Sequence, residues 1–560
     1  MRIFFRGIFL TLFLVFIGYA QHPDPVKGKN GMVVSASKIA SEVGVQILKK
    51  GGNAIDAAVA VGFALAVTYP AAGNIGGGGF MVIHFKDGKN TSIDFREKAP
   101  MNSHEEMYLD SAKNFLPHLS QEGELSAGVP GSVAGLILAL QKYGTMSLKE
   151  IIKPAIKLAE KGFILDEKLV QSINAFYSDF LKYPSSAKIF TKNGEPFIEG
   201  DRFIQKDLSK TLKLISKYGR DGFYKGEVAD KIVNQMKRSG GIITYEDLEN
   251  YKAVERTPIT STFKGYKIIT MGPPSGGGVI LLQSLNVLEN FEFSKDEWNS
   301  SSYIHKLVET FKYAYADRSK HLGDSDFYPV PLVELLNKDY SQRIFTQIGD
   351  KATPSSEIFP VKIKNYDESE ETTHYSVIDK YGNAVSVTTT INSAYGSKVV
   401  VEGAGFLLNN EMDDFSSKPG VPNQFGLTGS EANKIEPGKR MLSSMCPTII
   451  TKDAKPVLIL GSPGGSTIPT SVLQVIMNYL IFGMQIQAAV NSPRFHHQWL
   501  PDRIDFEERA ILNDVKENLL KKNHVLGFNR SLGRVEAISI ENGIFYGATD
   551  PRGFGGAVGY

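Results

Sequence analysis

The sequence predicts an α+β fold in which helices cover β-sheets, and two observations lead to this prediction. In the first half, apolar residues recur at helical spacing over 37–50, 54–67 and 147–162. In the second half, short segments rich in β-branched residues alternate between apolar and polar with period two. Neither an all-helical nor an all-β domain fits both halves. Strands are expected at 80–85, 92–95, 373–378, 384–391, 447–451 and 457–460.

The ends of these helices follow from the residues that flank them. A Gly-Gly pair at 51–52 stops the first helix, and the second is so apolar that it is expected to be buried. Ser147 and Glu150 have the spacing of a capping box, in which each side chain accepts a hydrogen bond from the other residue's backbone N–H. This pair opens the third helix, which ends at Gly162.

The overall composition excludes some classes of function. The chain has 560 residues, of which 42% are hydrophobic, enough for one large core or two ordinary ones. Lys and Arg number 62 against 60 Asp and Glu, so there is no electrostatic reason to expect nucleic acid or an anionic membrane as a partner. The single cysteine, Cys446, cannot form an intramolecular disulfide and has no histidine near it in sequence. It is expected to be a buried, small apolar residue.

The N-terminus has the pattern of a signal peptide over residues 1–20. Arg2 and Arg6 supply positive charge, 8–17 is apolar apart from Thr11, and 18–20 offers small residues for cleavage. A membrane anchor is the alternative, but the apolar run is shorter than the ~20 residues that a spanning helix needs. We therefore expect an exported protein, periplasmic or extracellular, with no membrane association after the signal is removed.

Two segments have the composition of irregular chain. Residues 367–371 hold four carboxylates in five positions, which is typical of a solvated linker, and a regular hairpin begins directly after them at Thr372. Residues 418–439 carry three prolines and four glycines between expected strands. A loop of this length in a compact domain is usually a functional lid or a disordered insert.

The hairpin that follows Thr372 has a predictable register. Gly382 supplies the left-handed residue of a three-residue loop, so Asp379 is expected to face Asn383. Counting back along both strands places Thr372 opposite Thr390, with Cβ atoms ~5 Å apart, within reach of a hydroxyl–hydroxyl hydrogen bond. Facing threonines are also common in ordinary strands, and the hairpin alone favours that structural interpretation.

Three further motifs have both a functional and a structural interpretation. The glycines at 76–79 suggest a nucleotide loop, but their spacing is wrong and they follow a helix, so close backbone packing is favoured. Residues 461–466 lack the lysine of a phosphate-binding loop and the spacing of a dinucleotide fingerprint. His496 and His497 suggest a metal pair, but adjacent side chains diverge and no cysteine or carboxylate spacing completes a site. No metal or cofactor is expected.

Longer sequence motifs decide between the functional and the structural interpretations. In order along the chain they are Asp94-Phe-Arg-Glu97, Glu371-Thr-Thr-His-Tyr-Ser-Val-Ile-Asp379, Leu407-Leu-Asn-Asn-Glu-Met-Asp-Asp-Phe-Ser416, Met441-Leu-Ser-Ser-Met-Cys-Pro447, Gly461-Ser-Pro-Gly-Gly-Ser466 and Tyr546-Gly-Ala-Thr-Asp-Pro-Arg552. Together they resemble the γ-glutamyltransferases, a family of N-terminal nucleophile hydrolases, over about residues 31–560. The resemblance implies a four-layer αββα sandwich that a large subunit (21–371) and a small catalytic subunit (372–560) form jointly.

The resemblance also implies self-cleavage at the Glu371–Thr372 bond, after which Thr372 acts as the nucleophile. A threonine hydroxyl is a weak nucleophile without a neighbouring base, and a freed α-amine, with a pKa of ~7.7 to 8, can accept its proton at neutral pH. Thr390 is then expected to hydrogen-bond Thr372. Gly464 and Gly465 are expected to donate backbone N–H groups to the oxyanion.

The remaining implied residues recognise an amino-acid head group. Arg96 with Ser443 and Ser444 is expected to bind the α-carboxylate, because a guanidinium fork matches two oxygens. The α-ammonium is expected to bind three residues, namely Asn392, Glu411 and Asp414. Alternatively, Arg96 and Glu97 form a surface ion pair and 411–414 only starts a helix. Phe425 lies in the expected lid, where many bacterial relatives have a tyrosine.

The expected donors are glutathione and other γ-glutamyl compounds, with water, amino acids or dipeptides as acceptors. A β-lactam side-chain acylase on the same fold is one alternative, and it has no use for the carboxylate of Asp414. An uncleaved, non-enzymatic binding protein is another, which the presence of Thr372, Thr390 and Arg96 disfavours. A nucleotide-dependent enzyme fails on motif spacing.

Overall fold

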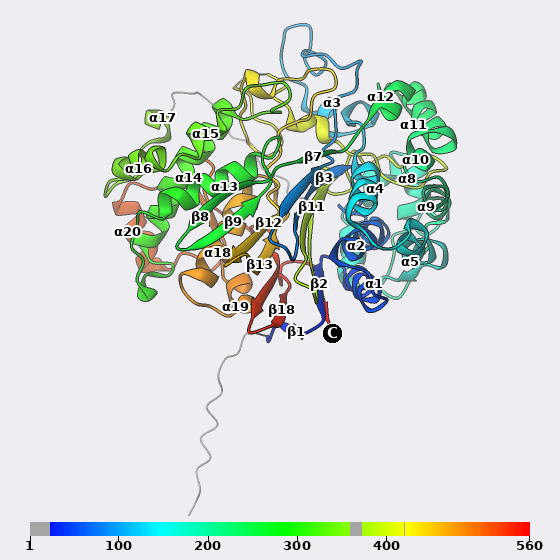
Figure 1. Cartoon of the computed structure of the whole chain (residues 1–560). Coiled ribbons are helices and arrows are strands. Elements are labelled where there is room, and N and C mark those ends of the chain that lie inside the picture. Colours follow the sequence, from blue (N-terminus) through cyan, green and yellow to red (C-terminus); the bar gives the residue numbers. More distant parts are fainter. Residues whose placement is uncertain (1–22, 359–371, 419) are drawn as a thin grey trace, which may run out of the picture.

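The computed structural model describes residues 23–358, 372–418 and 420–560. Two seven-stranded antiparallel sheets lie at its centre (Figure 1). The first has the order β1 (Val26–Gly28), β18 (Ile544–Ala548), β17 (Glu536–Glu541), β13 (Lys455–Gly461), β12 (Thr448–Lys452), β9 (Tyr266–Thr270) and β8 (Ile259–Phe263). The second has the order β19 (Gly556–Gly559), β2 (Gly31–Ser35), β10 (Thr373–Asp379), β11 (Ala384–Thr390), β3 (Gly78–His84), β4 (Asn90–Asp94) and β7 (Val254–Arg256). The predicted α+β class is confirmed, and every expected strand is present with its ends within two residues of expectation.

Helices flank the pair of sheets on both sides, which gives four layers (Figure 1). Beside the second sheet lie α1 (Lys38–Lys49), α2 (Ala54–Thr68) and α4 (Ser132–Tyr143), and α5 (Leu148–Lys161) packs against α2. Beside the first lie α13 (Gly276–Leu288) and α18 (Ile468–Leu480), and α14 (Ser301–His321) packs against α13. Between the sheets, β10 and β11 pack against β13 and β17. Strand β2 shows the resulting alternation, because Val33 joins the core under α1 and α2 while Met32 and Val34 join the core shared with the first sheet.

The other elements are short or lie at the periphery. The helices are α3 (Pro117–Gln121), α6 (Glu167–Asn174), α7 (Tyr177–Leu181), α8 (Pro184–Phe190), α9 (Lys206–Tyr218), α10 (Asp221–Tyr224), α11 (Gly226–Ser239), α12 (Tyr245–Asn250), α15 (Leu332–Leu335), α16 (Lys338–Gln347), α17 (Ser355–Ile358), α19 (Ile486–Asn491) and α20 (Asn513–Lys521). The 3₁₀ turns are η1 (Glu124–Ser126), η2 (Lys295–Glu297), η3 (Glu411–Asp414), η4 (Glu431–Asn433) and η5 (Gly465–Thr467). The strands β5 (Phe163–Ile164) and β6 (Arg202–Phe203) form one small sheet, and β14 (Phe495–His496), β15 (Ile504–Phe506) and β16 (Leu526–Asn529) form another.

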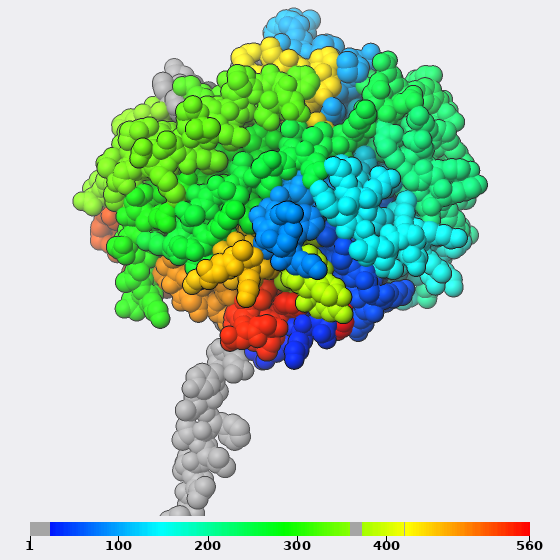
Figure 2. All heavy atoms as spheres, in the orientation of Figure 1, coloured from blue at the N-terminus to red at the C-terminus, as the bar shows by residue number. Residues whose placement is uncertain are grey.

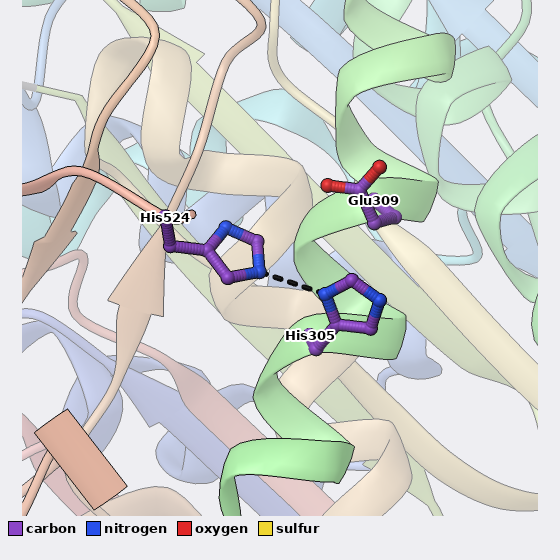
Figure 3. A group of neighbouring side chains, drawn as sticks. All are labelled: His305, Glu309 and His524. Atoms are coloured by element: carbon purple, nitrogen blue, oxygen red, sulfur yellow. Dashed lines mark hydrogen bonds between the residues drawn. The ribbon is translucent and has the colours of Figure 1, made fainter. Parts of the chain in front are cut away.

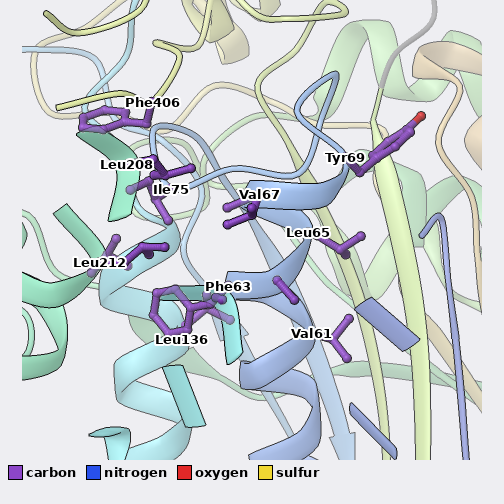
Figure 4. Close-up of a cluster of buried hydrophobic side chains, with 14 of the residues drawn as sticks. Val61, Phe63, Leu65, Val67, Tyr69, Ile75, Leu136, Leu208, Leu212 and Phe406 are labelled. Carbon is purple, nitrogen blue, oxygen red and sulfur yellow. The ribbon is translucent and has the colours of Figure 1, made fainter. Parts of the chain in front are cut away.

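The three helices expected from the sequence are α1, α2 and α5. All 15 residues of α2 are buried, as its apolar composition predicts, and side chains such as Phe63 and Val67 fill the core against α4 and α9 (Figure 4). Ser147 and Glu150 form the predicted capping box of α5, with Pro154 accommodated inside the helix. None of the described helices is long and apolar enough to cross a membrane.

Both sheets combine strands from before and after residue 372. In the second sheet, β10 and β11 lie between β2 and β3, and in the first, β12 lies between β13 and β9. The space-filling view shows the two parts of the chain sharing one continuous surface (Figure 2). A cut before Thr372 therefore leaves two segments that remain interleaved in one core. The expected signal peptide (1–20) and acidic linker (367–371), which includes Glu371, lie outside the described residues.

The glycines at 76–79 serve close backbone packing, as expected. A Cβ atom on Gly76 would lie 2.1 Å from the carbonyl oxygen of Leu407, and one on Gly77 would lie 2.1 Å from that of Thr390. This run therefore holds the loop before β3 against the end of β11. Cys446 is fully buried, and burial raises the pKa of its thiol. It is the inert apolar residue that the sequence predicts.

Candidate active site

The hairpin of β10 and β11 has the predicted register. Thr373 pairs with Thr389 and Ile378 with Ala384, which is the pairing that places Thr372 beside Thr390. Thr372 and Thr390 line one pocket, and both are nearly buried. The Thr390 hydroxyl accepts a hydrogen bond of 2.7 Å from the backbone N–H of Asn392, which fixes its orientation.

A glycine turn borders this pocket, and Gly465 lines it. Gly464 and Gly465 connect β13 to η5 and α18, and both have positive φ, 129° and 51°. A Cβ atom on Gly465 would also lie only 2.6 Å from the ring of Phe425. Backbone conformation and crowding thus both require glycine at this position. The turn precedes the N-terminus of α18, where backbone N–H groups and the helix dipole favour negative charge.

Arg96 lies behind the pocket, fully buried at 0% exposure, so the alternative of a surface ion pair with Glu97 is wrong. Its Nη1 donates to Glu97 at 3.5 Å and to Glu411, and its Nη2 donates to Asp414 at 2.5 Å. The carbonyl oxygens of Met441 and Leu442 accept two further bonds, at 3.2 and 3.4 Å. An arginine has five N–H donors, and all five are used.

Ser443 and Ser444 reach the pocket from a segment that α13 holds in place. The Ser443 carbonyl oxygen accepts from the backbone N–H of Gly276 at 2.7 Å, and the Ser443 N–H donates to the Pro274 carbonyl at 2.9 Å. A Cβ atom on Gly277 would lie 2.0 Å from the Ser444 carbonyl oxygen. The glycines that open α13 therefore allow the serine segment to approach closely.

Within the segment expected to be a lid, 418–439, Phe425 lines the pocket, and residues 431–433 form η4, a regular element that the composition does not predict. Phe425 points inward and is 4% exposed, and its carbonyl oxygen accepts from Gln498 Nε2 at 3.1 Å. Asn423 organises this turn, because its Oδ1 accepts the backbone N–H groups of Phe425 and Leu427 while its Nδ2 donates to Asp414 at 3.2 Å. This turn is thereby tied to a carboxylate of the pocket.

Comparisons with known proteins identify the family. The family model described as Gamma-glutamyltranspeptidase matches residues 40–560. The chain belongs to this family. The "Glutathione hydrolase proenzyme" of Escherichia coli K12 is 50% identical over 96% of this chain and 93% of that protein, and the one of Bacillus subtilis 168 is 42% identical over 97% and 93%. Among solved structures, a cephalosporin acylase from Bacillus halodurans is similar with a TM-score of 0.86 and 28% identity, over 97% of this chain and 98% of that one. A γ-glutamyltranspeptidase from Helicobacter pylori is 49% identical over 61% of this chain and 97% of that one, with a TM-score of 0.58.

Most of the site residues that the γ-glutamyltranspeptidase resemblance implies meet in this pocket. The lining includes Thr372, Thr390, Asn392, Glu411, Asp414, Phe425, Ser443, Ser444 and Gly465. Arg96 and Gly464 are adjacent to it without lining it, and Glu371 lies outside the described residues. Sequence reasoning missed Arg318, which also lines the pocket. A signal was present, because Arg318 continues the apolar stripe of Ile304, Phe311 and Tyr315 on α14.

Burial dominates the electrostatics of this γ-glutamyltranspeptidase pocket. It raises the pKa of Glu97 to about 7 and that of Glu411 well above its usual range, in both cases against the attraction of Arg96. Burial also raises the pKa of Asp414, with Arg96 and then Arg318 opposing it. Three carboxylates thus surround one guanidinium, and an added cation would favour their ionised forms.

One group of side chains outside the pocket has the composition of a metal site. His305 and Glu309 on α14 lie beside His524, and their ligand atoms are all within 4.8 Å of one another (Figure 3). These atoms are already engaged. His305 Nε2 donates to the Gly349 carbonyl at 2.8 Å, so its Nδ1 must accept from His524 Nε2, also at 2.8 Å. Glu309 pairs with the Lys312 ammonium at 2.8 Å, and a cation there opposes a metal ion. We therefore assign the group a structural role, linking segments from before and after residue 372.

The adjacent histidines 496 and 497 have separate, structural partners. His496 bonds to the side chains of Thr470 and Gln498, and His497 bonds to Asp502 at 3.2 Å. These partners support the structural interpretation of this pair.

Proposed function

We propose that this chain is a self-cleaving γ-glutamyltransferase that removes the γ-glutamyl group from glutathione and related amides. The observation that carries the proposal is its 50% identity, over nearly the full length of both chains, to a glutathione hydrolase proenzyme. The pocket that gathers Thr372, Thr390, Gly465 and two carboxylates supports it independently.

Processing begins at Thr372. Its hydroxyl oxygen attacks the carbonyl carbon of Glu371, and the peptide C–N bond breaks as the nitrogen takes a proton. Water then hydrolyses the resulting ester, which frees the hydroxyl and leaves an α-amine on Thr372 and a carboxylate on Glu371. That amine is the base that the hydroxyl needs in turnover, because no histidine lines the described pocket.

In turnover, Thr372 attacks the γ-carbonyl of the donor and forms a γ-glutamyl ester as the amine or peptide leaves with a proton. The N–H groups of Gly464 and Gly465, at the positive end of α18, stabilise the oxyanion, and such a donor typically contributes about 3 kcal/mol to lowering the barrier. Thr390, oriented by Asn392, hydrogen-bonds Thr372. Water completes hydrolysis, and an amino acid or dipeptide completes transfer.

When the head group of the donor binds, it replaces ion pairs that the residues of the pocket form with one another. Its α-ammonium binds Glu411 and Asp414 with Asn392, and displaces bonds that these carboxylates now accept from Arg96. Arg96 is then able to donate to the α-carboxylate together with Ser443 and Ser444. Phe425 closes the pocket to water but has no hydroxyl with which to bond across it.

The same proposal covers processing and location. The two segments 21–371 and 372–560 stay together as large and small subunits because their strands alternate in both sheets. The positive and apolar pattern of residues 1–20 supports export, to the periplasm or the medium.

A β-lactam side-chain acylase is the second candidate, favoured by the similarity to a cephalosporin acylase structure. Glu97, Glu411 and Asp414 share the single guanidinium of Arg96, and this excess of negative charge argues for a donor that carries a cation, which a neutral acyl group does not supply.

The deciding experiment combines mass and activity. The purified protein should consist of two chains, the smaller beginning Thr-Thr-His-Tyr, and it should release 4-nitroaniline from L-γ-glutamyl-4-nitroanilide. Thr372→Ala should remain one chain. A single chain with full activity would refute self-processing, whereas release from a glutaryl or adipyl anilide in preference to the γ-glutamyl anilide would favour the acylase.

A further inference from the structure

Arg318 is a buried cation without a counter-ion at the edge of the pocket. It lies in the last turn of α14, is 4% exposed and lines the same cavity as Thr372 and Asp414. Among the described residues, no carboxylate oxygen lies within the 4.0 Å of an ion pair, and its attraction to Asp414 acts over a longer distance. Burying an unpaired charge is costly, so such a residue needs a function.

The hydrogen bonds of Arg318 are also incomplete. Nη1 makes one long bond of 3.5 Å to the carbonyl oxygen of Thr428 in the lid, and Nε is buried without a partner. Arg96 provides the contrast within the same site, because its five donors are all used and it stands behind Glu411 and Asp414. Of the two guanidiniums, only Arg318 has N–H groups that can bind a ligand without first breaking an existing ion pair.

Charge indicates what Arg318 binds. The carboxylates of Glu411 and Asp414 already provide for a cation, whereas Arg318 is the positive group that lines the described pocket. An amino-acid head group carries one charge of each sign on a single carbon. With its ammonium at the carboxylates, its carboxylate lies next to that position, and a guanidinium fork suits two carboxylate oxygens.

We propose that Arg318 determines specificity by binding the α-carboxylate of the γ-glutamyl donor, as a second guanidinium beside Arg96. The contact to Thr428 links the same side chain to the lid, so that an occupied carboxylate site lies directly beneath the closed segment. This inference rests on the proposed function, because it presumes a donor with a free α-amino acid head group.

The test compares three ligands that differ by one charge. L-glutamate carries both charges, 4-aminobutanoate lacks the α-carboxylate and glutarate lacks the amine. For the wild type, we expect L-glutamate to raise the melting temperature of the processed protein more than either analogue does. In Arg318→Met, the advantage of glutamate over 4-aminobutanoate should disappear while its advantage over glutarate remains. Arg343→Met, on the exposed face of α16, is the matched control and should behave as the wild type.

Kinetics with the anilide donors give the second readout. In Arg318→Met, KM for L-γ-glutamyl-4-nitroanilide should rise by ~30-fold or more, as for the loss of one partner of a buried charge pair. The 4-aminobutanoyl anilide should be affected by less than ~3-fold, and self-cleavage should proceed. If Arg318→Met does not accumulate folded, Arg318→Lys decides, because it keeps the charge and loses the fork and should raise KM in the same donor-selective way. If a folded, processed variant keeps the wild-type preference for the γ-glutamyl over the 4-aminobutanoyl anilide, this inference is wrong and the proposed function still stands. A wild type that neither cleaves itself nor uses γ-glutamyl donors would overturn the proposed function with it.

Discussion

Replacing Arg96 with lysine tests the central ion-pair network. A lysine has three N–H donors where arginine has five, so at least two of the five bonds that Arg96 makes must be lost. A hydrogen bond to a charged group contributes about 1.5–3 kcal/mol, which sets the total loss at about 3–6 kcal/mol. Part of this loss lowers the free energy of unfolding, and the rest weakens donor binding.

The expected result is a fall in kcat/KM for L-γ-glutamyl-4-nitroanilide of at least about 30-fold, equivalent to about 2 kcal/mol. Self-cleavage should proceed, because Arg96 does not line the pocket beside Thr372. Arg494→Lys is the control, since Arg494 is equally buried and pairs with Asp550 at 2.7 Å away from the pocket. It should lower the melting temperature without changing kcat/KM. If both variants lose stability and both keep kcat/KM, the head-group role of Arg96 is wrong.

Three further predictions address single residues. Asp414→Ala should lower kcat/KM for the γ-glutamyl anilide by ~30-fold or more. The already low kcat/KM for the glutaryl anilide should stay nearly unchanged, because that donor has no ammonium. Equal losses of kcat/KM on both donors would contradict an ammonium site. Gly465→Ala places an alanine at an unfavourable φ of 51°, with its Cβ atom 2.6 Å from the ring of Phe425. The kcat of the processed enzyme should therefore fall by ~10-fold or more. An unchanged kcat would exclude Gly465 from the oxyanion site. Burial lowers the pKa of His374 to about 3, against about 6.5 in the unfolded chain, so below pH 6.5 the unfolded state binds a proton that the folded state does not. The test compares the free energy of unfolding, measured in urea, of Thr372→Ala with that of Thr372→Ala/His374→Gln. Between about pH 6 and 4, the value for the variant that keeps His374 should fall relative to the other by up to about 1.4 kcal/mol per pH unit. A difference that stays constant with pH would refute the lowered pKa of His374.

Local features of this fold could be predicted from the sequence. The register of β10 and β11 follows from one glycine in a short loop, so the neighbourhood of Thr372 and Thr390 was accessible by counting. The helices α2 and α5 follow from composition and from a capping box. These predictions succeed because the interactions that decide them lie within a few residues of one another.

Long-range contacts were not predictable in the same way. Arg96 is paired with Glu411 across 315 residues, and no pattern in either segment indicates that the arginine would be saturated by carboxylates. The prolines and glycines of 418–439 predict a loop, but they do not indicate the role of Asn423, whose partners depend on how the loop folds back over Asp414. Sequence reasoning did not single out Arg318, although one charged residue in an apolar helix stripe marks a place where the core meets a polar site.

The balance of charge in the pocket explains why it should select an intact amino-acid head group. Arg96 pairs with Glu97, Glu411 and Asp414, Arg318 lines the same pocket as the last two, and burial favours the neutral forms of all three acids. A zwitterionic head group adds no net charge, so it can exchange partners with these ion pairs at little electrostatic cost. A donor without the amine leaves three carboxylates sharing the single Arg96 guanidinium, and one without the carboxylate leaves Arg318 without a counter-ion, each a penalty of about 1–3 kcal/mol or more. Two independent penalties, measurable in separate variants, give a stronger preference for the head group than either charge alone.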